Sequence, residues 1–144
     1  MTTLWLAVTQ RPPRMPVITF DGHRLSIEDV CALARRRSIP ALSAVPAFRE
    51  RIRRGAAFVG RTLADEGVIY GVTTGYGESV GVAVPRELVH ELPERLSTYH
   101  GVGLGPPFGA EETRAILAAR LQSWVQGFSG VSEGLLEALT RLLI

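Results

Sequence analysis

Hydrophobic side chains recur every three or four positions along most of the chain, which places them on one face of an amphipathic helix. The longest such pattern covers residues 46–66, and its apolar face consists of Phe48, Ile52, Ala56, Val59 and Leu63. Shorter patterns of the same period cover residues 26–37, 110–125 and 132–143. We therefore expect a mainly α fold.

The two C-terminal patterns carry many apolar residues. In the helix that begins at Ala110, the expected apolar face consists of Ile116, Leu117, Ala119, Leu121, Trp124 and Val125. In the last helix it consists of Leu135, Leu136, Leu139, Leu142 and Leu143. An apolar helix at the end of the sequence needs a surface to cover it. We therefore expect it to meet a partner, or the sequence to be a piece of something longer.

Capping and helix-breaking residues mark the expected ends of these helices. Ser26 is a typical N-cap residue, and Asp29 takes the position that a capping box usually gives to Glu. Gly67 suits the C-terminal stop of the long helix. Pro93 lies inside a helical stretch at residues 86–98, and we expect it to kink or split that stretch.

The N-terminal residues lack the helical period. Residues 1–16 contain three prolines and are expected to form a loose tail. Residues 17–24 alternate weakly and include Asp21-Gly22, a dipeptide typical of tight turns, so a minor β-strand or hairpin is expected there. Residues 17–144 are then the folded part of the chain.

Composition places the chain in the soluble globular class. It has 144 residues, of which 46% are hydrophobic and 21% charged, as expected for one ordinary domain. No apolar run approaches the roughly 20 residues of a membrane span. The N-terminus also lacks the basic start of a signal peptide. We therefore expect no membrane association and a cytoplasmic location.

All 16 basic residues are arginine. The clusters at residues 35–37 and 49–54 lie on helical patterns without a Gly-rich or aromatic RNA-binding motif. We therefore expect solvated helix faces, or ion pairs with another chain, and no binding of nucleic acid. The single cysteine, Cys31, lies in an apolar helical pattern and should serve packing. Because one cysteine cannot form a zinc cage, no metal site is predicted.

A glycine-rich stretch, IYGVTTGYGESVG at residues 69–81, interrupts the helical patterns. Gly71, Gly75 and Gly77 can adopt positive φ and let the backbone approach a ligand closely. The hydroxyls of Thr73 and Thr74 can pin such a loop by hydrogen bonds. A phosphate-binding loop is disfavoured, because the stretch matches neither the P-loop pattern nor the dinucleotide-binding fingerprint.

Tyr70 lies at the junction between the long helix and this loop, where its phenol could point into a cleft. A tyrosine phenol in water stays protonated at neutral pH and is not a base. Backbone amides of a glycine loop could change this by donating hydrogen bonds to the phenolate. The alternative is a plain Gly/Thr turn with a half-buried tyrosine.

Three motifs resemble, in order and spacing, the N-terminal part of the aromatic amino-acid ammonia-lyase and aminomutase family. This family includes histidine, phenylalanine and tyrosine ammonia-lyases and tyrosine aminomutases. The first motif is IYGVTTGYGE, the second is RLSTYHGVGLGPPF at residues 95–108, and the third is RAILAARLQSWVQGFSGV at residues 114–131. The resemblance covers roughly residues 17–144 and implies the helical fold of these enzymes.

The resemblance also implies roles for individual residues. Tyr70 matches the tyrosine that takes the β-proton of the substrate, and Gly77 matches the loop glycine that lies against the bound amino acid. Tyr99 and His100 match the pair on which substrate choice depends, although Tyr-His fits none of the known pairs cleanly. His100 can hydrogen-bond a phenol or an imidazole, so a polar aromatic substrate, His or Tyr, is expected. Alternatively, His100 is a helix-end histidine bonded to local backbone.

Family members form an electrophile, 4-methylideneimidazole-5-one (MIO), from an internal Ala-Ser-Gly, and their active sites draw residues from several subunits of a tetramer. This chain contains no Ala-Ser-Gly; its Ser129-Gly130 follows Phe128. We therefore expect an N-terminal fragment or split subunit, truncated before the triad and inactive alone. MIO would come from a missing downstream segment or from a complementing chain in an oligomer.

A second interpretation is that the chain is a non-catalytic helical module, derived from this family, that oligomerises or binds an aromatic ligand. It is favoured by Pro93 and Arg95, which stand where family members have Gln and Asn.

Overall fold

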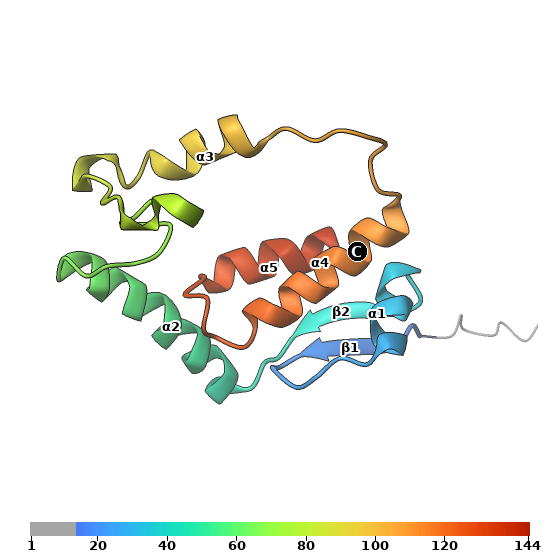
Figure 1. Cartoon of the computed structure of the whole chain (residues 1–144). Helices are drawn as coiled ribbons and strands as arrows, with labels where there is room; N and C mark the ends of the chain where they lie inside the picture. The colour runs from blue at the N-terminus through green and yellow to red at the C-terminus, as the bar shows by residue number, and fades with distance from the viewer. Residues whose placement is uncertain (1–13) are drawn as a thin grey trace, which may run out of the picture.

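A computed structural model describes residues 14–144, apart from the side chain of Tyr99. The described residues form five α-helices and two short strands, with two short 3-10 helices in the segment between α2 and α3 (Figure 1). The elements in chain order are β1 (Val17–Phe20), α1 (Ile27–Ala34), β2 (Ile39–Leu42), α2 (Pro46–Ala64), η1 (Gly77–Gly81), η2 (Arg86–Leu88), α3 (Leu92–His100), α4 (Ala110–Trp124) and α5 (Glu133–Leu142). The predicted mainly α fold is confirmed.

The two strands form a parallel sheet in which Val17 lies opposite Ile39 and Phe20 opposite Leu42. The expected strand at residues 17–24 is therefore present, but the hairpin prediction was wrong. Gly22, with a φ of 103°, bends the chain away from β1 and toward α1. Parallel strands need a crossover between them, and α1 provides it.

The predicted capping box at the start of α1 is confirmed. Ser26 Oγ accepts a hydrogen bond from the Asp29 N–H at 3.1 Å, and Asp29 Oδ2 accepts one from the Ser26 N–H at 3.0 Å. Two of the N–H groups that have no partner inside the helix are satisfied in this way.

Ser26→Ala should lower the free energy of unfolding by about 1 kcal/mol, because the cap hydroxyl is lost. Chemical denaturation followed by circular dichroism would measure this change. Ser123→Ala, at an exposed position within α4, is the control and should not destabilise, since alanine has the higher helix propensity. Equal effects of the two substitutions would contradict the capping role.

The end of α2 involves Gly67, as predicted, but the left-handed residue is Glu66, with a φ of 59°. The Gly67 N–H donates to the Thr62 carbonyl at 2.7 Å, and the Glu66 N–H donates to the Leu63 carbonyl at 3.4 Å. These two hydrogen bonds satisfy two carbonyls of the last helical turn. The chain leaves α2 through a fixed turn as a result.

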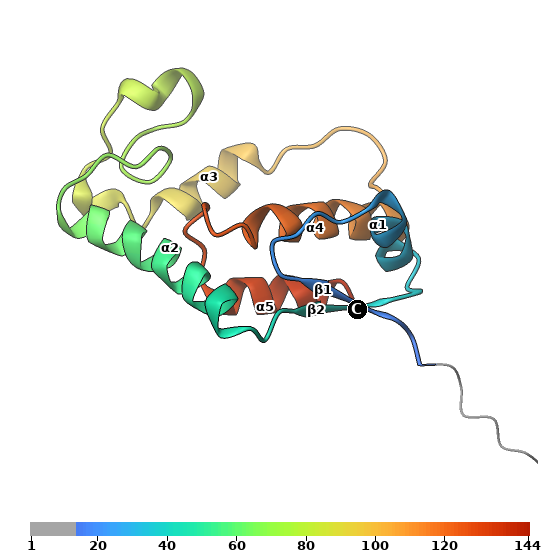
Figure 2. The same cartoon turned by 90° about the horizontal axis from the view of Figure 1, so that it is seen from below.

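The hydrophobic core lies between the sheet, α1, the first half of α2, α4 and α5. Its buried members are Phe20, Leu33, Phe48, Ile52, Ala118, Leu121, Val125, Leu136, Leu139 and Leu143. Figures 1 and 2 show α4 and α5 running side by side next to the two strands.

The predicted apolar faces of α4 and α5 need correction. On α4, Ile116 and Ala119 are exposed, and Ala118 takes the buried position next to Leu121. Apolar residues lie around much of α4, so the pattern could not select the buried side; contacts with α1 and α5 do so. On α5, Leu135 and Leu142 are exposed.

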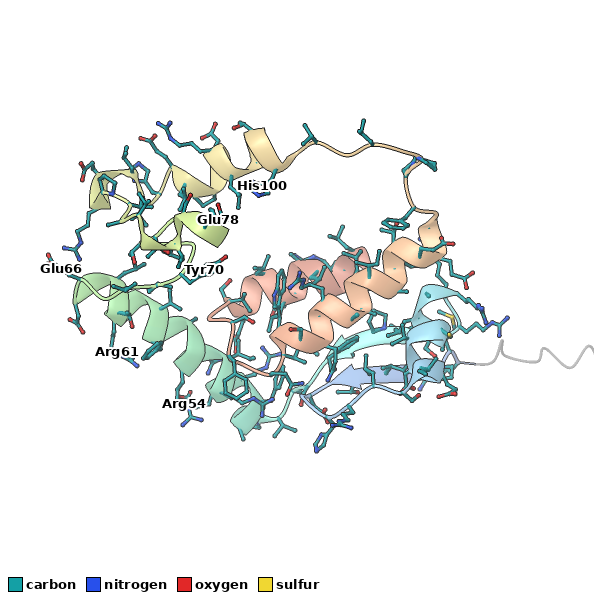
Figure 3. All side chains as sticks on the ribbon, in the orientation of Figure 1. Arg54, Arg61, Glu66, Tyr70, Glu78 and His100 are labelled. Carbon is teal, nitrogen blue, oxygen red and sulfur yellow. The ribbon has the colours of Figure 1, made fainter. Side chains whose placement is uncertain are left out.

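Several arginines of the two clusters form ion pairs within the chain. Arg35 Nε lies 2.7 Å from Glu111 Oε1 and so links α1 to α4. Arg53 Nε lies 3.4 Å from Glu133 Oε1 and links α2 to α5. Figure 3 shows Arg54 and Arg61 pointing away from the helices behind them, and both are exposed.

Three further predictions concern the remainder of the chain. The predicted tail, residues 1–16, lies largely outside the described residues. Cys31 is a free cysteine and is partly buried on α1. Within residues 14–144, no helix combines the length and apolar character that crossing a membrane requires.

Residues 65–109, which we call the arm, stand apart from the core. Among the described residues, buried apolar side chains occur at residues 20–52 and 118–143 but not in the arm. Figures 1 and 2 show the arm connected to the remainder by α2 at one end and by an extended segment before α4 at the other. The arm therefore depends on hydrogen bonds and close turns for its shape.

Candidate functional site

Threonine hydroxyls fold the glycine-rich part of the arm. Thr73 Oγ1 accepts a hydrogen bond from the Ile69 N–H at 2.8 Å, and Thr74 Oγ1 accepts one from the Gly71 N–H at 3.2 Å. Thr74 is 6% exposed, which makes it the most buried residue of the arm among those described. The predicted pinning of the loop by its threonines is confirmed.

A short antiparallel bridge between Thr74 and Ala83 closes the loop on itself. The Val84 N–H donates to the Thr73 carbonyl at 2.9 Å, and the Gly75 N–H donates to the Val82 carbonyl at 3.0 Å. The two ends of the loop are thus hydrogen-bonded to each other, and its tip, which contains the 3-10 helix η1, extends beyond these bonds.

Two of the glycines need their conformations. Gly71 has a φ of 69°, and a Cβ there would lie 2.6 Å from Cε1 of Tyr76, so this ring packs directly on the glycine. Gly77 has a φ of 56°, and a Cβ there would meet no atom within 4 Å. Of these two glycines, Gly71 is therefore also required by packing, whereas the space beside Gly77 is open.

The Tyr70 side chain is 62% exposed and does not pack into the core. Its Oη accepts a hydrogen bond from the Gly77 N–H at 3.1 Å. An amide that donates to a phenol oxygen stabilises negative charge on that oxygen. The loop thus contains a donor of the type that a tyrosine base requires.

Three aromatic rings form a row from the loop to α3. The centroids of Tyr70 and Tyr76 are 6.2 Å apart with the rings edge to face, and those of Tyr76 and His100 are 6.4 Å apart. In Figure 3, Tyr70 is labelled in the loop and His100 on α3. Residues from two separate motifs of the sequence are therefore brought together.

An open pocket of about 270 Å³ lies beside this row, lined by Gly75, Tyr76, Gly77, Ser79, Leu92 and His100. Two of the four residues singled out from the sequence, Gly77 and His100, line it directly. Tyr70 does not line the pocket, but it contacts two residues that do, Gly77 and Tyr76.

The helix that presents His100 begins normally despite Pro93. The predicted helical stretch at residues 86–98 is split into η2 and α3, and Pro93 lies in the first turn of α3. A proline is tolerated there because the first N–H groups of a helix have no partner within it. The predicted split of this stretch is confirmed, and α3 itself runs without interruption from Leu92 to His100.

At the start of α3, the Arg95 guanidinium contacts the carboxylate of Glu91, the residue that precedes the helix, at 2.7 Å. Its hydrogen bond and positive charge hold the pKa of the Glu91 carboxyl below its usual range. Arg95 is thus paired with Glu91 near the start of α3, more than one helical turn from His100.

Tyr76 is the residue that sequence reasoning missed. It lines the pocket and contacts both Tyr70 and His100. The signal was present in the motif, since Gly71 and the two threonines form a turn that folds Tyr76 back over the residues next to Tyr70. Within the described part of the chain, no group of three or more His, Cys, Asp or Glu side chains could hold a metal ion.

Comparison with known proteins identifies one family. The family described as aromatic amino acid lyase matches residues 25–144. A histidine ammonia-lyase of Gloeobacter violaceus is 38% identical over 126 residues, which are 88% of this chain and 24% of that protein. The MIO-dependent tyrosine 2,3-aminomutase of Streptomyces globisporus is 37% identical over 142 residues, which are 96% of this chain and 25% of that protein.

The fold has the same relatives. The crystal structure of the Streptomyces globisporus tyrosine aminomutase matches with a TM-score of 0.80 at 34% sequence identity, over 89% of this chain and 24% of that one. The chain thus spans about a quarter of the length of the relatives that it matches.

Proposed function

Because the chain belongs to the aromatic amino acid lyase family, we propose that it contributes Tyr70 as the base of an ammonia-lyase or aminomutase reaction. The observation that carries this proposal is the hydrogen bond from the Gly77 N–H to Tyr70 Oη, made by a tyrosine that is 62% exposed. The oxygen of this phenol is supported by an amide and remains accessible, as a base for an external substrate must be.

In the proposed reaction the deprotonated Tyr70 oxygen takes the β-proton of the amino acid. The electron pair of the broken C–H bond forms the new double bond, and the α-amino group leaves as ammonia. Gly77 serves the proton transfer by donating a hydrogen bond to the phenol oxygen, which holds this oxygen in a fixed position.

The leaving of the amino group requires an electrophile, which in this family is MIO. When present, MIO captures the substrate and makes the amino group a good leaving group. The residues of this chain cannot form it, because the sequence contains no Ala-Ser-Gly. We therefore propose that MIO is formed by residues outside this sequence, on the same longer polypeptide or on another subunit, and that residues 17–144 are the N-terminal part of a lyase domain.

The proposed substrate is a polar aromatic amino acid, histidine or tyrosine. His100 lines the pocket, and an imidazole can donate to or accept from a phenol or another imidazole. The relatives include a histidine ammonia-lyase and a tyrosine aminomutase, which agrees with either substrate. We assign the open space beside Gly77 to the bound amino acid, and Tyr99 is proposed to contact it together with His100.

The test is complementation. The 144-residue chain alone should release no ammonia from tyrosine or histidine and should lack the near-ultraviolet absorbance of MIO. A chimera would join this chain to the remaining three quarters of the Streptomyces globisporus tyrosine aminomutase, which retain their own Ala-Ser-Gly. This chimera should convert tyrosine. Turnover by the purified 144-residue chain would contradict the proposed division of roles.

A second candidate function is a non-catalytic module that oligomerises through the arm or binds an aromatic ligand. It is favoured by the exposed apolar side chains of the arm, which include Val68, Val102, Leu104 and Phe108. Light scattering would report self-association, and calorimetry with aromatic amino acids would report binding. A folded chimera that binds tyrosine without converting it would favour this function over the first.

A further inference from the structure

We propose that Arg86 is a positioning residue that joins the two ends of the loop containing Tyr70 and thereby aligns Tyr70 with Gly77. The inference rests on the proposed function, because it concerns the placement of the base in that reaction. Arg86 is the first residue of η2 and lies at the point where the chain leaves the loop. Its side chain contacts the end of α2, from which the chain enters the loop.

The guanidinium of Arg86 makes three contacts at the end of α2. Nη1 lies 2.9 Å from Glu66 Oε1, and Nη2 donates to the carbonyls of Leu63 and Ala64, the latter at 3.2 Å. Carbonyls in the last turn of a helix lack intrahelical partners and form the negative end of its dipole, so a cation is favoured there. The planar fork of arginine can serve a carboxylate and two carbonyls together.

These contacts join the two ends of the loop. Glu66 is the left-handed residue at which the chain leaves α2, and Arg86 follows directly after the loop. Within the loop, backbone hydrogen bonds between Gly75 and Val82 and between Val84 and Thr73 join its first half to its second half. Tyr70 comes before these pairs in the chain, and Gly77 lies in the tip of the loop beyond them. The distance from Tyr70 to Gly77 therefore depends on how firmly the two halves of the loop are held together.

Arg86 does not act by touching the pocket that contains His100. It lines a different pocket of about 330 Å³, together with Leu63, Gly67 and Val84 among others. The residues that line the two pockets have no member in common. The effect of Arg86 on the Tyr70–Gly77 hydrogen bond is thus transmitted through the loop backbone, which defines a positioning residue rather than a catalytic one.

The test uses the 144-residue chain uniformly labelled with 15N and does not depend on activity. In Arg86→Gln, the Gly77 amide signal should move in the direction that Tyr70→Phe moves it, because both variants weaken the same hydrogen bond. Hydrogen exchange at the amides of Gly75, Gly77 and Val84 should accelerate by about fivefold. Arg86→Lys keeps the charge but not the fork and should fall between wild type and Arg86→Gln.

Arg35→Gln is the matched control, since it removes a similarly exposed arginine that links α1 to Glu111 of α4, outside the loop that contains Tyr70 and Gly77. It should leave the Gly77 signal and the three exchange rates unchanged. An unchanged Gly77 signal and unchanged exchange in Arg86→Gln would overturn the inference.

In the active chimera, Arg86→Gln should lower kcat by about tenfold with little change in KM, because misplacement of the base affects the reaction more than substrate binding. A rise in KM at unchanged kcat would also overturn the inference. If instead Tyr70→Phe left the chimera fully active, the proposed function would fail, while the amide measurements would still decide whether Arg86 aligns Tyr70 with Gly77.

Discussion

Tyr70→Phe should lower turnover by the tyrosine-converting chimera by about 10²- to 10⁴-fold, the usual range for the loss of a general base. Phenylalanine retains the ring that contacts Tyr76 but lacks the oxygen that accepts the Gly77 hydrogen bond. The proton at the β-carbon then has no acceptor, whereas the pocket walls are unchanged. Steady-state conversion of tyrosine to product, followed by chromatography, measures the effect.

Two comparisons separate lost catalysis from lost structure. The substrate affinity and melting temperature of the Tyr70→Phe chimera should remain near those of the parent chimera, because the altered side chain is 62% exposed. Thr98→Val is the hydroxyl control, since the Thr98 hydroxyl is exposed and donates to the Arg95 carbonyl at 2.7 Å in its own helix. A similar loss of turnover in both variants would show that Tyr70 is not the base.

Phe20→Ala should destabilise the chain by about 3–5 kcal/mol, the usual cost of deleting a fully buried phenylalanine. Phe20 is 0% exposed at the end of β1 and packs in the core with residues of α1, α4 and α5. Removal of its ring leaves a cavity that these rigid elements cannot fill. Denaturant unfolding followed by circular dichroism measures the change in the free energy of unfolding.

Phe128→Ala is the matched control because it deletes the same side chain at a position that is 94% exposed. Its effect should stay within about 0.5 kcal/mol, as is usual for substitutions on the surface. Equal destabilisation by the two substitutions would contradict the core described for this chain.

Helix positions and helix ends could be predicted because they depend on neighbours in the sequence. The period of the apolar residues located α2, and Ser26 with Asp29 located the start of α1. The motif that contains Tyr70 and Gly77 was also recognisable, since its glycines and threonines act within a few residues of one another. For the same reason the threonine bonds that fold the loop agreed with expectation.

Pairings over long distances could not be predicted in this way. The period of residues 17–20 is compatible with either a hairpin or a parallel strand, and the partner strand lies 22 positions further along the chain. The buried side of α4 was misassigned at Ile116 and Ala119, because apolar residues surround that helix. Both the partner of β1 and the buried side of α4 depend on how much apolar surface is buried against elements that are distant in the sequence. A local pattern does not contain this information.

The sequence by itself determined which segments are helical, where the main caps lie and that Tyr70 belongs to a glycine-rich loop, because these features result from local periodicity and local hydrogen bonds. The tertiary structure alone decided that Tyr76 lies between Tyr70 and His100 and that Arg86 returns to the end of α2. These contacts arise only after the chain has turned back on itself and brought together side chains that are distant in the sequence.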